Sequence, residues 1–353
     1  MPLRSAVKQL LKCRLLMPTD NPAERFAKLA AGFASLRILV VGDLMLDEFI
    51  WGKVSRISPE APVPIVTVTG ESYYPGGAAN VVRNLKEFTG HVAIMGLAGE
   101  DAAGDRLLAL LGAAGIDTTC VQRDPSFETT RKTRIIARNQ QVVRVDRERK
   151  PALTGAETAR AIEQLDGMMA GVDAIVVADY GKGFVTQLLA DHLCRSAGAH
   201  GRILTVDPHP HTSLEWIGVT AVKPNRLEAF IAAGMPPTDP VTPVPSDAAL
   251  LEVGHLLRRR WQAQNLLITL GEYGMLLFAG DAPPTHMPTR AKEVFDVSGA
   301  GDTAIAVLTL GLAAGATPAE AAELANRASG IAVGKLGTAT VTLDELRESF
   351  RSL

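Results

Sequence analysis

The sequence predicts an α/β fold in which a mostly parallel sheet lies between two layers of helices, with a small second β-sheet inserted. Three observations predict it. Short apolar runs alternate with segments of helical periodicity along most of the 353 residues. The runs are continuously apolar, which is typical of parallel strands buried on both faces. Residues 51–69 and 129–147 are rich in β-forming residues but offer no crossover helix, so we expect them to form the second sheet.

The elements of the main sheet follow in order from these patterns. Residues 37–41 are the first apolar run, and six later runs have the same character: residues 92–97, 174–178, 203–206, 219–222, 266–270 and 275–278. We expect each run to be a strand. Between them, apolar residues recur three and four positions apart, which predicts helices over residues 78–88, 105–114, 156–169, 187–197 and 248–263.

The domain boundaries are set by where this alternation begins. Residues 1–33 scatter basic residues among apolar ones and never build the apolar core of a secretory signal. We expect them to be a poorly ordered N-terminal extension. Residues 34–353 then form one domain, with the inserted strands over about residues 49–75 and 118–147.

Composition and charge exclude several classes of protein. Lys and Arg number 36 against 38 Asp and Glu, so the chain has no overall basic field for nucleic acid or an anionic membrane. The longest uncharged stretch, residues 303–319, is shorter than the roughly 20 residues that a membrane helix needs. Cys13, Cys120 and Cys194 are too far apart for a metal motif or a disulfide framework, which favours a reducing, cytoplasmic location.

Polar and glycine residues follow most of the predicted strands directly. They stand at residues 42–43, 96, 179–182, 207–208, 223–225 and 269–271. Open α/β sheets bind ligands at the carboxyl ends of their strands, where these residues would gather. The pattern favours an enzyme over a structural protein.

The strongest chemical motif is the glycine-rich turn Gly299-Ala300-Gly301-Asp302, which enters the uncharged helix. Its glycines allow a sharp turn whose free N–H groups and positive helix end suit a phosphate. An aspartate there would repel a merely bound phosphate, but it suits a base that takes the proton of an acceptor hydroxyl. The alternative is a helix-capping role for the aspartate.

Two further interpretations of this turn fit the sequence less well. Gly299-x-Gly301-x-x-Ala304 could be a dinucleotide fingerprint, with Glu320 at the right distance. However, such a fingerprint opens a βαβ unit, whereas this one lies near the C-terminus, and Pro318 favours a helix start at the acidic residue. The P-loop motif is absent from the sequence.

Three other segments carry candidate binding residues, each with a plain structural alternative. Gly76, Gly77 and Asn80 open a helix and suit sugar hydroxyls, although a generic turn would contain the same glycines. Asn225 and Glu228 lie one helical turn apart and could position hydrated Mg²⁺ and phosphates, or form a capping box. The last segment joins two strands and could equally be a hairpin turn: Thr269, Gly271 and Gly274.

Taken in this order, the segments resemble the ribokinase (pfkB) family of sugar kinases over about residues 37–346. The resemblance implies a three-layer α/β/α sandwich with a small β lid, and ATP as phosphoryl donor with Mg²⁺. It implies Asp302 as base and residues 299–301 as the anion hole. Asn225, Glu228 (through water to Mg²⁺), residues 269–274 and Asn326 would serve the nucleotide. Asp47, Gly76, Gly77 and Asn80 would hold the sugar, and a monovalent cation could lie near Asp296.

Within that family, four stretches resemble the kinases of D-glycero-β-D-manno-heptose 7-phosphate: residues 55–64, 138–141, 179–182 and 333–338. That likeness implies phosphorylation of the anomeric hydroxyl in ADP-heptose and lipopolysaccharide core synthesis, and adds Arg138, Asp179 and Lys182 as substrate-binding candidates. Many such kinases are fused to an adenylyltransferase, but the chain has no H-x-G-H motif and we expect the kinase alone. Alternatives are a kinase of this family for another sugar or sugar phosphate, and a non-enzymatic sugar- or nucleotide-binding regulator.

The inserted hairpin is strongly basic, which suits a phosphorylated sugar. Residues 131–149 contain seven Lys or Arg against Asp146 and Glu148. A solvated strand face would look the same. Because a small exposed sheet is seldom stable alone, we also expect a homodimer that packs lid on lid.

Overall fold

The computed structural model describes residues 21–138, 140–150, 153–291, 293–335 and 337–351. Among these residues a nine-stranded sheet runs in the order β13-β12-β11-β10-β9-β8-β1-β4-β5. Its members are β1 (Arg37–Gly42), β4 (His91–Gly99), β5 (Asp117–Asp124), β8 (Ala174–Ala178), β9 (Ile203–Asp207), β10 (Ala221–Val222), β11 (Asn265–Thr269), β12 (Met275–Ala279) and β13 (Thr285–Met287). β12 pairs antiparallel with both β11 and β13, and all the other neighbouring strands pair parallel.

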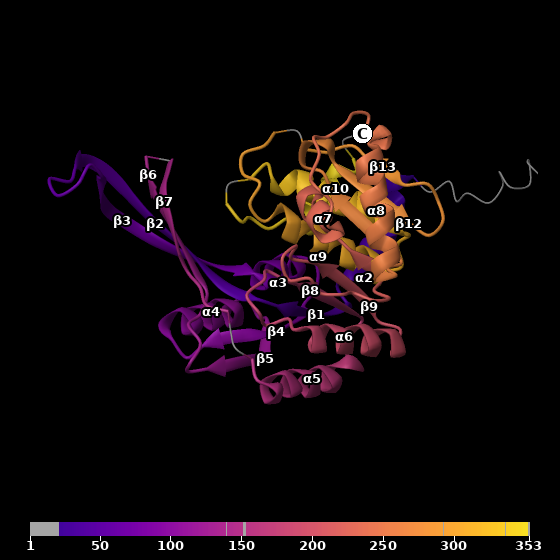
Figure 1. Cartoon of the computed structure of the whole chain (residues 1–353), viewed down its shortest axis with the longest axis horizontal. Coiled ribbons are helices and arrows are strands. Elements are labelled where there is room, and N and C mark those ends of the chain that lie inside the picture. Colours follow the sequence, from indigo (N-terminus) through magenta and orange to yellow (C-terminus); the bar gives the residue numbers. More distant parts are fainter. Residues whose placement is uncertain (1–20, 139, 151–152, 292, 336, 352–353) are drawn as a thin grey trace, which may run out of the picture.

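Helices cover both faces of this sheet (Figure 1). One layer contains α3 (Ala78–Lys86), α4 (Ala102–Ala113), α9 (Ala300–Ala313), α10 (Pro318–Ala332) and α11 (Leu343–Ser349). The other contains α5 (Gly155–Met169), α6 (Gln187–Ala199), α7 (Arg226–Ala233) and α8 (Ala248–Trp261). In β1, Ile38 and Val40 pack toward the first layer, and Leu39 and Val41 toward the second. This alternation within a fully apolar strand confirms the predicted sheet buried on both faces.

The second sheet, which we call the lid, extends away from the main sheet (Figure 1). Within the described residues its order is β3-β2-β6-β7, formed by β2 (Leu44–Ile57), β3 (Pro64–Gly77), β6 (Arg131–Ala137) and β7 (Gln140–Arg147). The prediction of a separate small sheet and of a hairpin over residues 129–147 is therefore confirmed. β2 begins two residues after β1, so the lid and the main sheet are joined at the strand ends where ligands are expected.

One part of the predicted lid belongs elsewhere. Residues 118–124 lie in β5, which pairs parallel with β4 at the edge of the main sheet. Cys120 is buried there and Gln122 is 6% exposed. The sequence does not separate an edge strand of the main sheet from a lid strand, because both have mixed apolar and polar residues.

The predicted poorly ordered extension is wrong for its last third. Residues 1–20 lie outside the described residues, but Pro22–Phe33 form α2, which Asn21 caps by accepting a hydrogen bond from the Ala23 N–H. Phe26 and Phe33 are buried. The Phe26 ring stacks on Phe350 after α11 at 4.8 Å between centroids, and Arg25 pairs with Glu320 of α10 at 2.7 Å. Glu320 lies 295 residues after Arg25, and Phe350 lies further still from Phe26, which is why local patterns do not reveal the helix as part of the core.

In the described part of the chain, no helix combines the length and the apolar character needed to cross a lipid bilayer.

Candidate active site

The glycine-rich turn forms the N-terminus of α9. Gly299 is the N-cap residue with φ 81°, a conformation that side chains disfavour, and Ala300 and Gly301 open the helix. Among the described residues no side chain caps it. The N–H groups of a helix's first turn lack partners within the helix, so this turn offers donors and a positive dipole end to an anion.

Asp302 is held by two donors from different parts of the chain. The Asn80 amide of α3 donates to Asp302 Oδ2 at 2.7 Å, and the Tyr180 hydroxyl, from the loop after β8, donates to Oδ1. Burial raises the pKa of Asp302 to about 6, while these two hydrogen bonds act in the opposite direction. A carboxylate with this pKa is ionised at neutral pH and basic enough to accept a proton. The side chain of Asp302 therefore does not cap α9, because its carboxylate is bonded to Asn80 and Tyr180 instead.

A buried ion pair lies beside the same turn. Lys223 Nζ is 2.9 Å from Asp207 Oδ2, and the Lys223 side chain is 3% exposed. The charge of Asp207 keeps the pKa of Lys223 above its ordinary value although burial acts to lower it. A Cβ built on Gly301 would lie 3.5 Å from Lys223 Nζ, so this cation faces the anion turn. Sequence reasoning assigned no role to Lys223; its signal was its position at the carboxyl end of β10, directly before Pro224 and Asn225.

A cleft of about 640 Å³ opens on one side of the turn. Ala300 and Gly301 line it together with the loop 269–274 and with Val294 and Val297. Four residues predicted to serve the nucleotide lie here: Thr269, Gly271, Gly274 and Asn326. The cleft is lined mainly by apolar surface together with part of the anion turn, which suits a nucleotide, whose apolar ring system is joined to phosphates.

Asn225 and Glu228 form the capping box of α7. Asn225 Oδ1 accepts from the Glu228 N–H at 2.9 Å, and Glu228 Oε2 accepts from the Asn225 N–H at 2.7 Å. Neither is among the described residues that line the cleft, although the backbone of Asn225 pairs in a single parallel β-bridge with Thr269, which does line it. The structural alternative for this pair is therefore realised, and it does not preclude a role for the carboxylate in holding a cation through water.

The donor set fits Mg²⁺ carried by a nucleotide and not a metal held by protein side chains alone. Within the described residues, no group of three or more His, Cys, Asp or Glu could hold a metal ion. Mg²⁺ commonly keeps several waters and uses one or two carboxylates together with substrate phosphates. The negative charge of Glu228 acts on Lys223 beside the anion turn, so this carboxylate lies near the place where a nucleotide's Mg²⁺ is expected.

On the lid side of the turn, Asp47 and Gly76 are in close contact. Asp47 of β2 is 5% exposed, and its Oδ1 accepts from Arg134 of β6. A Cβ on Gly76 would lie 2.3 Å from Asp47 Oδ2, so only glycine fits opposite this carboxylate. Gly77 follows with φ 59° and is the N-cap residue of the helix that carries Asn80. The predicted sugar residues of β2, β3 and α3 thus belong to one region.

The loop after β8 adds a cation to this region. Lys182 Nζ lies 2.6 Å from Glu148 Oε2, with side chains 19% and 40% exposed. Burial and the charge of Lys182 lower the pKa of Lys132, so the two ammonium groups are neighbours. Asp179 is held by two loops: it accepts from the Gly181 N–H of its own loop at 2.8 Å and from the Thr212 hydroxyl, in the loop after β9, at 2.7 Å.

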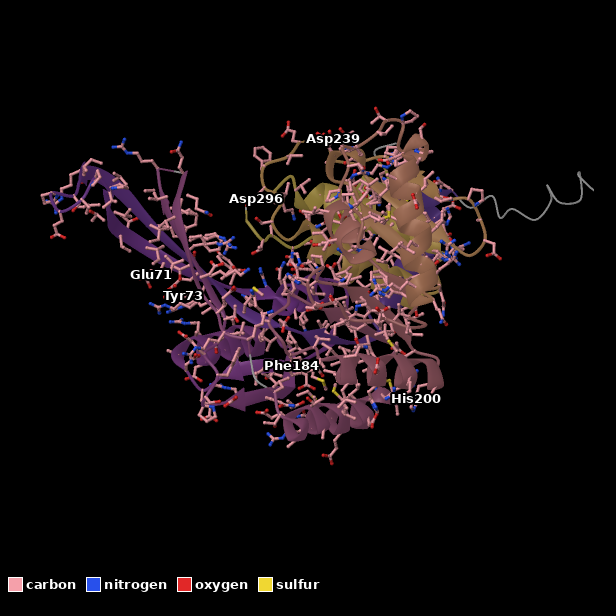
Figure 2. All side chains as sticks on the ribbon, in the orientation of Figure 1. Glu71, Tyr73, Phe184, His200, Asp239 and Asp296 are labelled. Atoms are coloured by element: carbon pink, nitrogen blue, oxygen red, sulfur yellow. The ribbon has the colours of Figure 1, made fainter. Side chains whose placement is uncertain are left out.

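Two predicted residues lie further out. Arg138 follows β6 at the turn of the lid hairpin, exposed and with φ 50°, where the hairpin extends away from the main sheet (Figure 1). Asp296 lies on the loop that faces the lid (Figure 2). Its oxygens accept from the Ser298 N–H at 2.9 Å and the Gly337 N–H at 3.1 Å. Burial acts to raise its pKa, but these bonds keep that pKa below its ordinary value.

Comparison with known proteins identifies relatives over almost the whole chain. The family model for pfkB family carbohydrate kinases matches residues 35–345. Bifunctional protein HldE of Trichlorobacter lovleyi is 44% identical over 313 residues, which are 89% of this chain and 62% of that protein. The same-named protein of Caulobacter vibrioides is 43% identical over 324 residues, covering 92% and 65%. The chain therefore spans about three fifths of the length of the curated relatives it matches.

Solved structures show the same fold at low identity. Phosphofructokinase-2 from Escherichia coli in complex with potassium superposes with a TM-score of 0.71, covering 90% of this chain and 98% of that chain at 19% identity. The main sheet and lid together are thus the ribokinase-like α/β fold.

Proposed function

The chain belongs to the pfkB family of carbohydrate kinases, and from that premise we propose that it phosphorylates the anomeric hydroxyl of D-glycero-β-D-manno-heptose 7-phosphate with ATP. The product is heptose 1,7-bisphosphate, for ADP-heptose and lipopolysaccharide core synthesis. One observation carries the proposal: Asp302 stands at the anion turn, with a nucleotide-sized cleft on one side and the cation-rich base of the lid on the other.

The chain's own groups account for each part of the transfer. Asp302 accepts the proton of the anomeric hydroxyl as that oxygen bonds to the γ-phosphorus of ATP, and the bond to the bridging oxygen of ADP breaks. The N–H groups at the start of α9 and the ammonium of Lys223 face the negative charge of the transferring group. Glu228 would hold the Mg²⁺ of the nucleotide through water, and the bound ion would supply further neutralising charge.

The cations around Asp47 support a phosphorylated sugar. Arg134 and Lys132 lie on β6, and Lys182 lies on the loop that also carries Tyr180. Among the described residues Glu148 is the ion-pair partner of Lys182, and a sugar phosphate would give this ammonium a second anionic partner. Arg138 would join the site only when the hairpin tip folds over the sugar, as a lid does on closure.

Phosphorus NMR of the reaction tests this proposal. With ATP, Mg²⁺ and heptose 7-phosphate, we expect an anomeric phosphate signal to appear in step with ADP. Fructose 6-phosphate, ribose and adenosine serve as competing acceptors. Faster turnover of another acceptor would show that heptose 7-phosphate is not the substrate, while the assignment as a kinase would stand. Binding of ATP and sugar phosphate without any turnover would favour the regulator alternative.

We also propose that the protein is a homodimer joined through the lid. The lid carries exposed apolar side chains on both hairpins: Trp51 (41%), Val68 (53%), Val142 (39%), Val143 (44%) and Val145 (44%). Such a surface is typical of a protein interface. Analytical ultracentrifugation should give twice the chain mass, and a Val143→Glu variant should sediment as a monomer. Because ATP is the donor, we expect the dimer to act in the cytoplasm, with potassium or a similar cation near Asp296.

A further inference from the structure

Tyr180 is a polar group at the centre of the site to which sequence motifs assigned no role. Its hydroxyl donates to Asp302 Oδ1, while Asn80 donates to Oδ2. The two oxygens of the base are therefore each held by a neutral donor. Each oxygen keeps a further lone pair that can receive a proton.

The backbone that carries Tyr180 is fixed by a buried carboxylate. Asp43, directly after β1, is 3% exposed. Its Oδ2 accepts from the N–H groups of Tyr180 at 2.9 Å and Lys182 at 3.0 Å, and its Oδ1 accepts from that of Phe184 at 3.1 Å. Three hydrogen bonds to one charged group leave this loop little freedom. The backbone of Tyr180 is thus anchored to the main sheet through Asp43, and this anchor places the tyrosine ring beside Asp302.

The charges around the pair keep the phenol a donor. Burial, and then the negative charges of Asp302, Asp207 and Asp47, raise the pKa of Tyr180 well above its ordinary value. Asp302 itself faces Asp207, which acts to raise its pKa, and Lys223, which acts to lower it. A hydrogen bond to the ionised form of a carboxyl group favours that form.

We propose that Tyr180 is a positioning residue that keeps the Asp302 carboxylate ionised and oriented for taking the proton of the acceptor hydroxyl. Its effect does not require direct contact with the sugar. The inference rests on the proposed role of Asp302 as base.

The first test measures the carboxyl group directly and needs no substrate. In protein labelled with ¹³C at the aspartate carboxyls, Asp302 is assigned by the signal missing from Asp302→Asn. In Tyr180→Phe, which keeps the ring, we expect the pKa of Asp302 to rise by about one unit, the size of one hydrogen bond to a charged group. Tyr73 is a matched control: it lies on the lid (Figure 2) and donates to Glu71 at 2.7 Å. Tyr73→Phe should leave the titration of Asp302 unchanged.

The second test is the pH profile of kcat/KM for the sugar phosphate. Tyr180→Phe should be about tenfold slower than wild type below pH 6 and approach the wild-type rate above pH 8, with the KM for ATP unchanged. An Asp302 titration identical in the variant and the wild type would overturn the proposal, as would an equal loss of rate at every pH. If wild-type protein showed no sugar-dependent turnover, the proposed function would fail, and the NMR titration would still decide the role of Tyr180.

Discussion

The contact between Lys182 and Glu148 makes a two-sided prediction about substrate affinity. In the proposed function Lys182 would bind the distal phosphate of the sugar, and in the structure it is paired with Glu148 at 2.6 Å. Replacing Lys182 by Ala removes a charge-assisted contact of about 1.5–3 kcal/mol, which corresponds to roughly a 10- to 150-fold rise in the KM for heptose 7-phosphate. Because the Lys182 side chain is 19% exposed and water weakens its contacts, we expect the rise in KM to fall in the lower half of that range.

Replacing Glu148 by Gln should act in the opposite direction. The carboxylate is 40% exposed, so its pair with Lys182 contributes only about 0–1 kcal/mol. Freeing Lys182 should therefore lower the KM for the sugar phosphate by up to about fivefold. The KM for ATP should not change in either variant.

Initial rates at saturating ATP, with the sugar phosphate varied, decide this prediction. Arg123 is a matched control, because it forms a 2.8 Å ion pair with Asp105 at the edge of the main sheet. Arg123→Ala should leave both KM values within about twofold. If Lys182→Ala also stays within twofold, the phosphate does not bind at this loop, and the basic lid is a solvated surface.

The other predictions concern the base and the metal. Asp302→Asn should lower kcat by at least about 10²-fold with little change in ATP affinity measured by calorimetry, because the base acts mainly in the transition state; turnover close to wild type would remove Asp302 from the mechanism. Since Asp302 must be ionised to act as the base and its pKa is about 6, kcat/KM should reach its maximum above about pH 7 and fall roughly tenfold per pH unit below pH 6. A profile that is flat down to pH 5 would contradict this. Glu228→Gln should raise the Mg²⁺ concentration for half-maximal rate while the melting temperature holds, because Gln also completes a capping box. An unchanged Mg²⁺ dependence would leave capping as the only role of Glu228.

The sequence predicted the parts of the site that are built locally. Gly299 and Gly301 next to Asp302 indicated the anion turn, and the order of strands and polar loops indicated where it would face. These signals are local because turn geometry depends on a few neighbouring residues. The resemblance to one family then supplied roles that spacing alone left open.

The parts that sequence reasoning missed depend on contacts between distant segments. The hydrogen bond from Tyr180 to Asp302 spans 122 residues, and that from Tyr180 to Asp43 spans 137. Asn225 and Glu228 show the converse: both roles fitted the spacing, and only the side-chain directions reveal that the capping box is formed. The pair Lys223–Asp207 was missed because a buried cation needs its partner from another strand to be recognised.

The docking of α2 has a consequence for how the protein is made. Its charged partner, Glu320, lies 295 residues after Arg25, and its aromatic partner, Phe350, lies later still. At 5–20 residues per second, a ribosome needs roughly 15–60 s to synthesise that interval. During this time Phe26 lacks Phe350, the ring on which it finally stacks, whereas Phe33 can already meet its earlier neighbour Phe88. We therefore expect α2 to be a site at which chaperones bind the nascent chain, and its docking to be among the last steps of folding.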